Sequence, residues 1–556
     1  MLYATQNCML EWSYTSGKQY DDPFNEIELS VEITDPDNER AVLPAFWSGG
    51  QIWCVRFAPA KIGKYHFRTI CSDASNLSLH SKEGDIEATA YQGTNPLYIH
   101  GPLQKTPGKA YLQHRDGTPF FWLADTWWME LSKRMRWPDE FKLLTGDRVK
   151  KGFSAIQIVA GLYPDMDPFD ERGANEAGFP WDKDFKRINP SYFDMADLRI
   201  DWLVKSGLVP CLVACWGYFM EFAGKDVIKK HWRYLIARYG AYPVVWAIAG
   251  EALMPFYGSI NWSPEKNKRY TELWTVKEKL EEYAKQMRHN WTEVTQYVKS
   301  TDPYKHPITI IHGRNMVDDP SILDFELMGG PHSSDRNALA ESVNVLHDSV
   351  KSEPKMPVIN GEVAYEGICG TCGQEVQRYV FWANMLNGAA GHTYGGDGIW
   401  QINTKEKPFG PSPHGAMWGD TPWSEAYLLP GSKQLGIGKA FLERYPWWKL
   451  EQHPEWIEFV KSEHNPIVPY AVGIPEKLRI VFIPYSLGAP GPIFKELEKG
   501  VQYHAFYFDP STGKEYDIGV ATGDENGKWE PENYIKSSPP VPIMRDMVLV
   551  FEKIGK

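Results

Sequence analysis

The sequence lacks several features that would each point to a particular class of protein. No apolar segment reaches the roughly 18 residues that a membrane-spanning helix needs. Long runs of Lys and Arg are missing and the formal net charge is -12, so we expect neither nucleic acid nor a membrane as a partner. The N-terminus, from Met1 to Gln6, has no basic region followed by an apolar stretch. The chain as given is therefore predicted to be cytoplasmic, or secreted or periplasmic if a leader has been removed.

Cysteine is scarce and odd in number, with seven residues scattered along the chain. This distribution excludes a disulfide framework. Cys369 and Cys372 have the spacing of a redox or zinc pair. However, no second pair stands at zinc-finger spacing, and no thioredoxin-like strand and helix flank them. We interpret both as structural or incidental thiols, and we expect no metal and no other cofactor.

Aromatic residues, by contrast, are abundant, with 23 Trp, 29 Tyr and 25 Phe. Sugars present flat C–H faces that stack on aromatic rings, while their hydroxyl groups need polar partners. A large core packed with aromatic side chains explains many of these residues. It does not explain the Trp residues that gather at predicted strand ends, and these favour a carbohydrate as the partner.

The pattern of apolar residues divides the chain into three predicted domains. Residues 1–97 contain short alternating stretches, such as 26–33, which are typical of an antiparallel β-sandwich. Residues 455–556 return to the same pattern, for example at 502–508, and predict a second β-sandwich. Between them, residues 98–454 alternate between buried strands and helices.

The central region predicts a (β/α)8 TIM barrel, because strand and helix alternate about eight times over roughly 350 residues. A doubly wound open sheet is the structural alternative, but no Gly-rich phosphate turn follows any predicted strand. Two long loops, 161–190 and 395–422, should form walls on the active face. The predicted strands are 120–125, 155–160, 209–216, 244–249, 308–312, 322–328, 357–362 and 389–394.

Two of these strands end in Gly-Glu, which places Glu251 after the fourth strand and Glu362 at the end of the seventh. In a closed barrel these strands lie on opposite sides of the ring, so the two carboxylates can face each other across the mouth. A separation of about 5 to 5.5 Å would make one a nucleophile and the other a general acid/base, with retention of anomeric configuration. A single Gly-Glu is equally explained by a carboxylate that pairs with Arg or with a helix N-terminus.

Other polar and aromatic residues near the strand ends are candidates for substrate contact. Each is as easily explained by packing. Asp125 is the strongest of them, because a carboxylate on an apolar strand is costly unless it is used or paired. The candidates are Asp125, Trp127, Trp128, Gln157, Trp216, His312, His332, Tyr365, Glu366, His392, Tyr394, Asp397 and Trp400.

Four segments carry a resemblance to a known family. Residues 121–128 (Phe-Trp-Leu-Ala-Asp-Thr-Trp-Trp), 151–157 (Lys-Gly-Phe-Ser-Ala-Ile-Gln), 246–251 (Trp-Ala-Ile-Ala-Gly-Glu) and 357–362 (Pro-Val-Ile-Asn-Gly-Glu) resemble the apiosidase-like branch of glycoside hydrolases, family 140 and its relatives. Both flanking β-regions are similar to the small β-domains attached to such barrels. The resemblance therefore covers nearly the whole chain.

The resemblance implies a retaining clan A hydrolase, with Glu251 at the acid/base position and Glu362 at the nucleophile position. One position departs from the family pattern, which has Asp after the glycine of the fourth strand where this chain has Glu251. The extra methylene moves the proton donor, so the resemblance does not fix the sugar.

Two other functions stay open at this point. A metal-dependent barrel hydrolase would use His312, His332, Glu362 and His392, but strand one has no His-x-His and no bridging Lys is present. A non-catalytic carbohydrate-binding protein is the other alternative, and the presence of both carboxylates speaks against it. The sequence also leaves open whether the chain forms a homo-oligomer.

Overall fold

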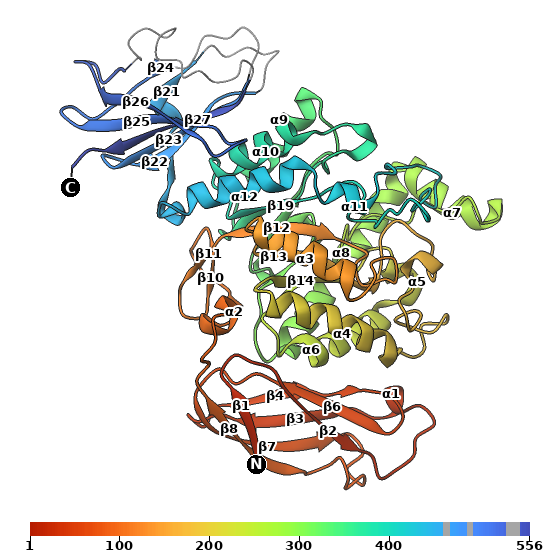
Figure 1. Cartoon of the computed structure of the whole chain (residues 1–556). Coiled ribbons are helices and arrows are strands. Elements are labelled where there is room, and N and C mark those ends of the chain that lie inside the picture. The colour runs from red at the N-terminus through yellow and green to blue at the C-terminus, as the bar shows by residue number, and fades with distance from the viewer. Residues whose placement is uncertain (460–466, 486–492, 530–544, 556) are drawn as a thin grey trace.

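The computed structural model describes residues 1–459, 467–485, 493–529 and 545–555. It contains a barrel of parallel strands between two sets of β-sheets, with the N-terminal sheets below the barrel in Figure 1 and the C-terminal sheets at its upper left. This architecture confirms the predicted TIM barrel with a β-sandwich on either side. The domain boundaries stay predictions: the one after residue 97 falls inside the short helix α2 (Pro96–Ile99), and the one after residue 454 inside a 3-10 turn, Pro454–Trp456.

The barrel is an eight-stranded parallel sheet within the described chain. Its end strands are joined by a parallel bridge between Ile311 and Leu327, which closes the ring. The strands are apolar on both faces, because one face fills the barrel and the other meets the helices. In order around the ring they are β16 (Ile308–Thr309), β15 (Val245–Ala247), β14 (Val209–Cys215), β13 (Ala155–Leu162), β12 (Trp122–Trp127), β19 (Gly391–Tyr394), β18 (Val358–Glu362) and β17 (Glu326–Gly329).

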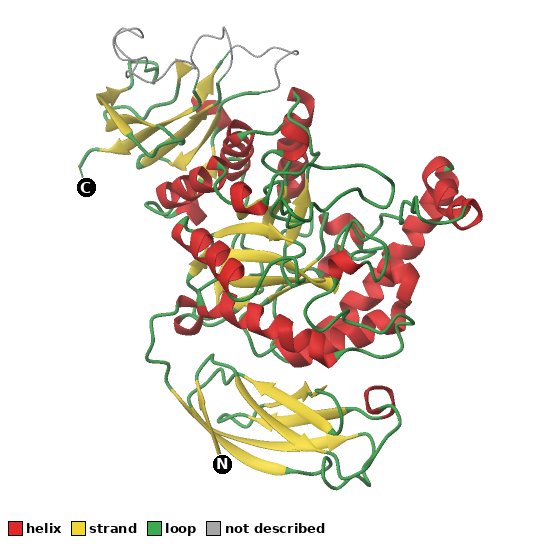
Figure 2. Cartoon of the chain, turned by 45° about the vertical axis from the view of Figure 1, so that its right-hand side comes forward, coloured by secondary structure: helices red, strands yellow, loops and turns green. Residues whose placement is uncertain are grey.

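Helices surround these strands, as Figure 2 shows. Ser263-Pro264-Glu265 is a helix start signal, and it predicts one long helical region that runs towards Asp302-Pro303. The structure divides this region at Val276, whose backbone is extended (φ -114°, ψ 105°). Helices α9 and α12 occupy segments for which the sequence patterns predicted no helix. The main helices are α3 (Asp139–Lys150), α4 (Pro190–Lys205), α6 (Lys225–Tyr239), α7 (Pro264–Thr275), α8 (Lys277–Thr301), α9 (Arg336–Lys351), α10 (Gln374–Met385) and α12 (Pro430–Leu442), with α5 (Phe219–Ala223) and α11 (Trp423–Ala426) in the loops.

The N-terminal region forms two packed sheets around a shared apolar core. Their strands are antiparallel as predicted, except that β1 pairs with β8 in parallel. One sheet has the order β1 (Leu2–Thr5), β8 (Glu83–Thr89), β7 (Gly63–Cys71), β3 (Leu29–Thr34), β4 (Arg40–Pro44), and the other β2 (Leu10–Thr15), β6 (Ile52–Phe57), β5 (Phe46–Trp47). The helical turn α1 (Pro23–Glu26) follows β2, and β9 (Leu103–Gln104), β10 (Leu112–His114) and β11 (Pro119–Phe120) form a small sheet before the barrel.

The C-terminal region is a second pair of antiparallel sheets, which share a core that includes Trp456, Phe494 and Phe551. In the described residues the larger sheet has the order β20 (Glu451–Gln452), β22 (Tyr470–Ile474), β23 (Leu478–Ile483), β27 (Met547–Lys553), β25 (Gln502–Phe508), β26 (Glu515–Thr522), and the smaller one pairs β21 (Ile457–Glu458) with β24 (Ile493–Phe494).

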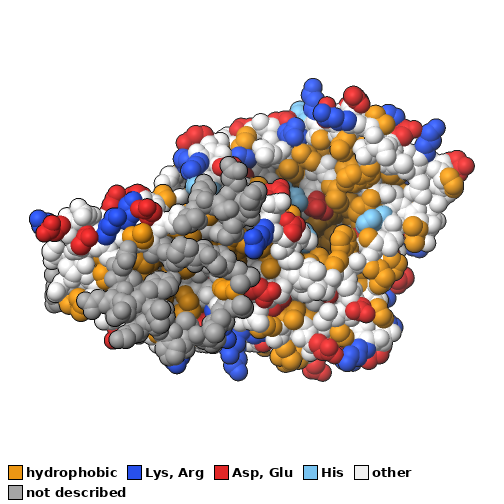
Figure 3. All heavy atoms as spheres, turned by 90° about the horizontal axis from the view of Figure 1, so that it is seen from above, with side chains coloured by type: hydrophobic (Ala, Val, Ile, Leu, Met, Phe, Trp, Pro, Cys, Tyr) orange, Lys and Arg blue, Asp and Glu red, His pale blue; other side chains and the backbone are white. Residues whose placement is uncertain are grey.

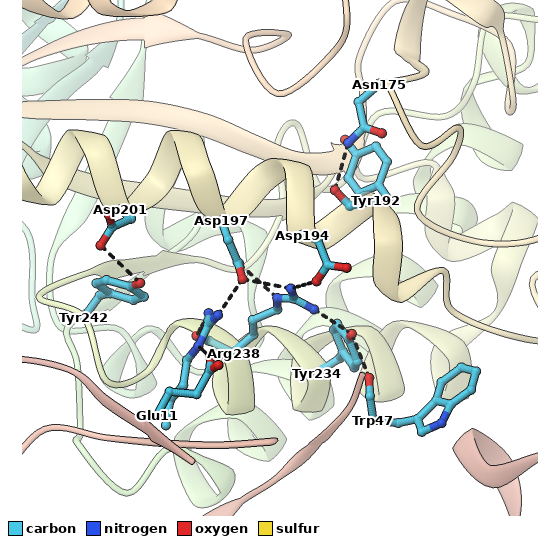
Figure 4. Close-up of polar contacts among 11 residues, drawn as sticks. Glu11, Trp47, Asn175, Tyr192, Asp194, Asp197, Asp201, Tyr234, Arg238 and Tyr242 are labelled. Carbon is cyan, nitrogen blue, oxygen red and sulfur yellow. Dashed lines mark hydrogen bonds and ion pairs between the residues drawn. The ribbon is translucent and has the colours of Figure 1, made fainter. Parts of the chain in front are cut away.

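Buried ion pairs join both flanking regions to the barrel helices. Arg56 of β6 lies 2.5 Å from Asp197 of α4 and donates to the carbonyl oxygen of Arg238 on α6. Arg238 itself points to Asp194 and Asp197 (Figure 4). At the other end, Arg378 of α10 pairs with Asp546, next to β27, at 2.7 Å. Charges removed from water need partners of this kind, so these pairs fix where the sheets dock.

Candidate active site

A pocket of about 290 Å³ opens at the carboxyl ends of the barrel strands, and both predicted catalytic carboxylates line it. Figure 3 shows this hollow rimmed by hydrophobic side chains, with acidic and histidine side chains inside it. Apolar walls with a few polar groups are typical of small-molecule sites. The lining residues are Trp128, Pro164, Asp165, Trp216, Glu251, Met254, Tyr257, His332, Glu362, Tyr365, Ile368, Trp400, His414 and Trp418.

Glu251 is held at the pocket by the Gly-Glu pattern of its strand. Gly250 forms a parallel bridge with Trp216, and a Cβ on residue 250 would lie 2.3 Å from the Trp216 ring. The glycine therefore lets the indole lie against the strand. From there the indole Nε1 donates a hydrogen bond of 2.8 Å to Oε2 of Glu251. Glu251 has a left-handed backbone (φ 40°), which is uncommon for a residue with a side chain.

Glu362 ends β18 and is surrounded by hydrogen-bond donors. The Tyr365 hydroxyl donates to Oε1 of Glu362 and accepts a bond of 3.0 Å from the Trp128 indole. Nε2 of His332 lies 3.5 Å from Oε1, and Nε2 of His312 lies 3.8 Å from Oε2. The carboxylate therefore has a phenol and two imidazoles around it.

These surroundings shift the two carboxyl pKa values in opposite directions. Burial raises the pKa of Glu251 and outweighs the charge of His312, which lowers it; the charge of Glu362 adds to the rise, and the Trp216 hydrogen bond acts against it. Burial also acts to raise the pKa of Glu362, but His312 and His332 outweigh it and hold that pKa well below its usual range. Correspondingly, Glu362 and Glu251 raise the pKa of His312 despite its burial. Glu362 is thus an anion near neutral pH, while Glu251 keeps its proton more readily than an ordinary carboxyl group.

Several predicted substrate contacts are gathered at the pocket. Trp128, Trp216, His332, Tyr365 and Trp400 line it. His312 stands beside Glu362, with about a third of its side chain (36%) exposed. Together with the two carboxylates they form one group, which comes from the carboxyl ends of seven different strands and the loops that follow them.

Four other candidates lie on the outer, helix-facing side of the barrel wall, which corrects the expectation that they contact substrate. Asp125 is fully buried and pairs with Arg148 of α3 at 2.6 Å. Its carboxylate also accepts from the indole of Trp127 at 2.7 Å. Two residues apart on β19, His392 packs against Phe381 of α10 and Tyr394 donates to Glu366. Alternation along a strand sends such residues away from the barrel axis.

Gln157, Glu366 and Asp397 also have structural partners instead of pocket positions, which corrects their assignment. Gln157 lies inside the barrel, where its amide donates to the carbonyl oxygen of Gly361 at 2.9 Å. Glu366 accepts from the backbone N–H of Gly431 at 3.0 Å, in the first turn of α12. This is the carboxylate at a helix N-terminus that a strand-end Glu can form. Asp397 accepts from the Gln401 amide at 2.9 Å inside its loop.

Seven pocket residues were not among the predicted ones: Pro164, Asp165, Met254, Tyr257, Ile368, His414 and Trp418. Asp165 and Trp418 lie in the two long loops that were predicted as walls of the active face. Asp165 accepts from the hydroxyls of Tyr257 (2.8 Å) and Ser412 (2.6 Å) and from the Trp418 indole (2.9 Å). Loop length was therefore the signal for these walls, but it could not single out residues within them.

The metal alternative needs His392 beside the pocket histidines, whereas His392 faces α10. Within the described residues, no group of three or more His, Cys, Asp or Glu side chains is placed to hold a metal ion. All seven cysteines are free thiols, with Cys369 exposed and Cys372 buried. None of the helices in the described residues combines the length and the apolar character needed to cross a membrane.

Residues 106–449 match the family model of the apiosidase-like catalytic domain, and residues 5–72 match DUF5060, a domain of unknown function. A search of curated proteins gave no match.

Among solved structures, a candidate glycoside hydrolase from Bacteroides vulgatus ATCC 8482 is 16% identical, with a TM-score of 0.66 over 100% of both chains. A glycoside hydrolase family 5 protein from the same strain is 20% identical, with a TM-score of 0.63 over 83% of this chain and 95% of that one. At these identities the structures show a shared fold. The family match, which spans well over half of the sequence, shows that this chain belongs to the apiosidase-like glycoside hydrolases.

Proposed function

We propose that the protein is a retaining glycoside hydrolase that cleaves a glycosidic bond in a plant- or microbe-derived glycan or glycoside. Glu362 is the nucleophile and Glu251 the general acid/base. Both carboxyl groups line one pocket with aromatic side chains on which a sugar ring can stack.

The reaction takes place in two displacements. Glu362 attacks the anomeric carbon while Glu251 gives its proton to the glycosidic oxygen, so that the leaving group departs as an alcohol and a glycosyl ester forms on Glu362. In the second displacement a water molecule attacks the same carbon while the ionised Glu251 takes a proton from it. The ester bond breaks, and Glu362 is released as a carboxylate. The Tyr365 hydroxyl and the His332 imidazole lie beside Glu362, the carboxylate that attacks in the first step and is the leaving group in the second.

The donors around Glu362 support this proposal: the Tyr365 hydroxyl bonds to one carboxylate oxygen, and the His332 and His312 imidazoles lie 3.5 and 3.8 Å from the two oxygens and hold the pKa of this carboxyl low. An inverting enzyme would need the second carboxylate as a base that activates water. A carboxylate with a strongly lowered pKa is a weak base at neutral pH. The same low pKa keeps Glu362 ionised for attack and makes it a good leaving group in the second step. Glu251, with its raised pKa, suits the donor role.

Aryl glycosides of apiose, arabinofuranose, galactose, glucose, fucose and xylose test the proposal. We expect at least one to be hydrolysed, and Glu362→Ala and Glu251→Ala to lower that rate by at least about a hundredfold. Glu171→Ala, which changes an exposed glutamate of the 161–190 loop, is the matched control.

Azide separates the two roles. Azide should rescue Glu362→Ala by attacking from the vacated side, which gives a glycosyl azide of inverted anomer. Rescue of Glu251→Ala should give the retained anomer, because azide then intercepts the ester on Glu362. If folded Glu362→Ala and Glu251→Ala proteins both keep activity within a few-fold of the unsubstituted enzyme, the assignment fails.

A further inference from the structure

A second pocket, of about 440 Å³, lies where the N-terminal sheets meet the barrel. We call it the junction pocket. One of its lining residues, Arg187, belongs to the barrel loop 161–190, and the others belong to the N-terminal segment that matches DUF5060. Ligand sites are common at such domain junctions, and this volume is in their range. In the described chain the junction pocket and the active-site pocket have no lining residue in common.

Three aromatic residues form the apolar part of the wall of the junction pocket. Trp47 and Trp53 are paired neighbours on β5 and β6, so both side chains lie on the same face of their sheet. They are 8% and 4% exposed, and Tyr20 is partly exposed. Tyr234 of α6 donates a hydrogen bond of 3.0 Å to the carbonyl oxygen of Trp47 (Figure 4). Because the indoles are packed and their strand is held to α6, this part of the wall exists before a ligand binds.

Polar side chains form another part of the wall. Gln19, Asp21 and Gln51 line the pocket and are exposed. A glutamine amide both donates and accepts hydrogen bonds, and a carboxylate accepts through two oxygens. In the described residues the Gln51 amide makes one long contact, of 3.5 Å, to the carbonyl oxygen of Lys18. These groups can therefore bind hydroxyl groups that point in several directions.

The charges of the junction pocket favour a neutral ligand. Nζ of Lys18 lies 2.9 Å from Asp73, and Nε of Arg187 lies 3.0 Å from Asp22. Each cation of the wall thus already has a carboxylate partner. An anionic ligand would have to displace one of these partners, and the exposed carboxylate of Asp21 would repel it. A cationic ligand would be repelled by Lys18 and Arg187.

We propose that the junction pocket binds a neutral sugar unit of a glycan, at a site separate from the one where the glycosidic bond is cleaved. A neutral sugar has an apolar C–H face for the aromatic wall, and it has hydroxyl groups for the amides and the carboxylate. The proposal assigns a ligand to the segment that matches DUF5060, and it does not depend on the reaction proposed for Glu251 and Glu362.

One loop of the barrel contributes to both pockets. The loop 161–190 provides Asp165 to the active-site pocket and Arg187 to the junction pocket. The end of this loop is docked on the helical turn α1, because the side chain of Asn25 donates to the carbonyl oxygen of Lys186 at 2.9 Å. The junction pocket is therefore a fixed part of the molecule and does not belong to a freely moving domain.

Calorimetric titration of the full chain with neutral trisaccharides of glucose, galactose, mannose, xylose and arabinose tests the proposal. All the proteins carry Glu362→Ala, which prevents cleavage during the titration. We expect at least one trisaccharide to bind at a site that Gln19→Ala with Gln51→Ala weakens at least about tenfold, a difference of about 1.4 kcal/mol. Gln92→Ala, at an exposed position after β8, is the control and should leave this binding unchanged. If none of the five binds, or if the double variant binds them equally well, the proposal is overturned.

Hydrogen exchange of the same proteins locates the bound trisaccharide. It should slow amide exchange across residues 16–23 and 47–53, and the double variant should lose this protection. Protection at the active-site pocket alone overturns the proposal. Trigalacturonate should bind to the junction pocket at least about tenfold more weakly than the best neutral trisaccharide, and equal or tighter binding overturns the assignment of a neutral ligand.

These measurements separate failure of this inference from failure of the proposed function. Protection of residues 16–23 and 47–53, when the unsubstituted protein hydrolyses none of the aryl glycosides, supports the junction pocket and contradicts the proposed reaction. Hydrolysis of an aryl glycoside without this protection supports the reaction and overturns the junction pocket.

Discussion

Glu251 and Glu362 carry the same functional group at the ends of two parallel strands, and their neighbours give them different properties. Glu251 has one indole N–H and a largely apolar wall, so burial dominates and raises its pKa. Glu362 has Tyr365, His312 and His332, and their hydrogen bonds and charges overcome the effect of burial. Pairs of carboxyl groups whose pKa values are driven apart are a known basis for acid and nucleophile roles.

The raised pKa of Glu251 predicts the alkaline limb of the pH profile. The general acid works protonated, so kcat/KM should fall as pH rises through a pKa that lies above 4.5, the ordinary value of a glutamate side chain. Glu251→Gln carries no titrating proton there and should lose this limb for an aryl glycoside with a reactive leaving group. kcat/KM measured from pH 4 to 9 checks this; an alkaline limb that is unchanged in Glu251→Gln would contradict the role.

His332 should control the acid limb. Glu362 must be ionised to attack, so activity is lost as pH falls through its pKa, which the histidines hold low. His332→Gln removes one of them and should move the acid limb to higher pH while lowering kcat. His347→Gln, on α9 and outside the pocket, is the matched control and should leave the profile in place. An acid limb in His332→Gln that coincides with that of the unsubstituted enzyme would show that His332 does not set this pKa.

At this scale the sequence indicated which residue types gather at the barrel mouth but not the side of the wall that each one faces. Asp125 was singled out because burying a carboxylate costs free energy unless the group has a function or a partner. Its partner, Arg148, lies 23 positions later on α3, and a distance in sequence of that size hides the pairing. His392 and Tyr394 lie on one face of β19 and Thr393 on the other, so polar atoms occur on both faces and no alternation shows which face is inward.

At the scale of elements, the two long loops are joined to the loop after β15 through one side chain. Asp165, in the loop after β13, accepts hydrogen bonds from Tyr257, Ser412 and Trp418. It has a left-handed backbone (φ 58°) and is 8% exposed. Residues held in such conformations often lie at binding sites. The pocket walls are thus set by a buried acceptor and not by the loops separately.

Asp165→Asn should loosen these walls. Three donors, on Tyr257, Ser412 and Trp418, bond to the Asp165 carboxylate. The substituted amide has one oxygen to accept with, so at least one of these donors loses this acceptor, at a cost of about 1 to 3 kcal/mol. We expect faster amide exchange across residues 412–418 and a KM that rises more than kcat falls. Asp182→Asn, in the same loop and bonded only within it in the described chain, should do neither. Exchange rates that match in both variants would mean that Asp165 does not hold the loops together.

Strand and helix types were predictable because their periodicities and end signals are local. Gly207 is a helix-end signal, and it follows α4 in a left-handed conformation (φ 81°), as predicted; the predicted start of this helix, Tyr192, lies two residues after the observed one, Pro190. The division between α7 and α8 was not predictable, because Val276 carries no turn signal in the sequence. The helices α9 and α12 were not predicted, because their segments could equally be interpreted as loops between strands.

At the scale of the whole molecule, charged residues buried between the flanking sheets and the barrel determine the assembly. Arg56 is 7% exposed and lies between Glu11 of β2 and Asp197 of α4, at 2.7 Å and 2.5 Å. In Figure 4 the Asp197 side chain points from its helix towards Arg238, to which it is also paired. The three-part order of the chain was predictable from its patterns, but the contact that docks the N-terminal sheets, Arg56 with Asp197, joins residues 141 positions apart and left no local signal.

Arg56→Met keeps the apolar stem of the side chain and removes its charge. Glu11 then loses this partner, whereas Asp197 still pairs with Arg238. We expect a loss of about 3 kcal/mol in the free energy of unfolding of the N-terminal sheets. Lys64→Met, which removes an exposed pair with Asp85 on the same region, should cost less than about 1 kcal/mol. Calorimetric unfolding of both variants checks this; equal losses would mean that Arg56 has no special part in docking.

The anomeric configuration of the first product tests the central claim most directly. Hydrolysis of the preferred aryl glycoside is followed by proton NMR within the time before the free sugar mutarotates. Because Glu362 is assigned as a nucleophile and Glu251 as its acid/base partner, the account predicts that the sugar first appears with the same anomeric configuration as the substrate. A first product of inverted configuration would show that water attacks directly, and it would contradict the account.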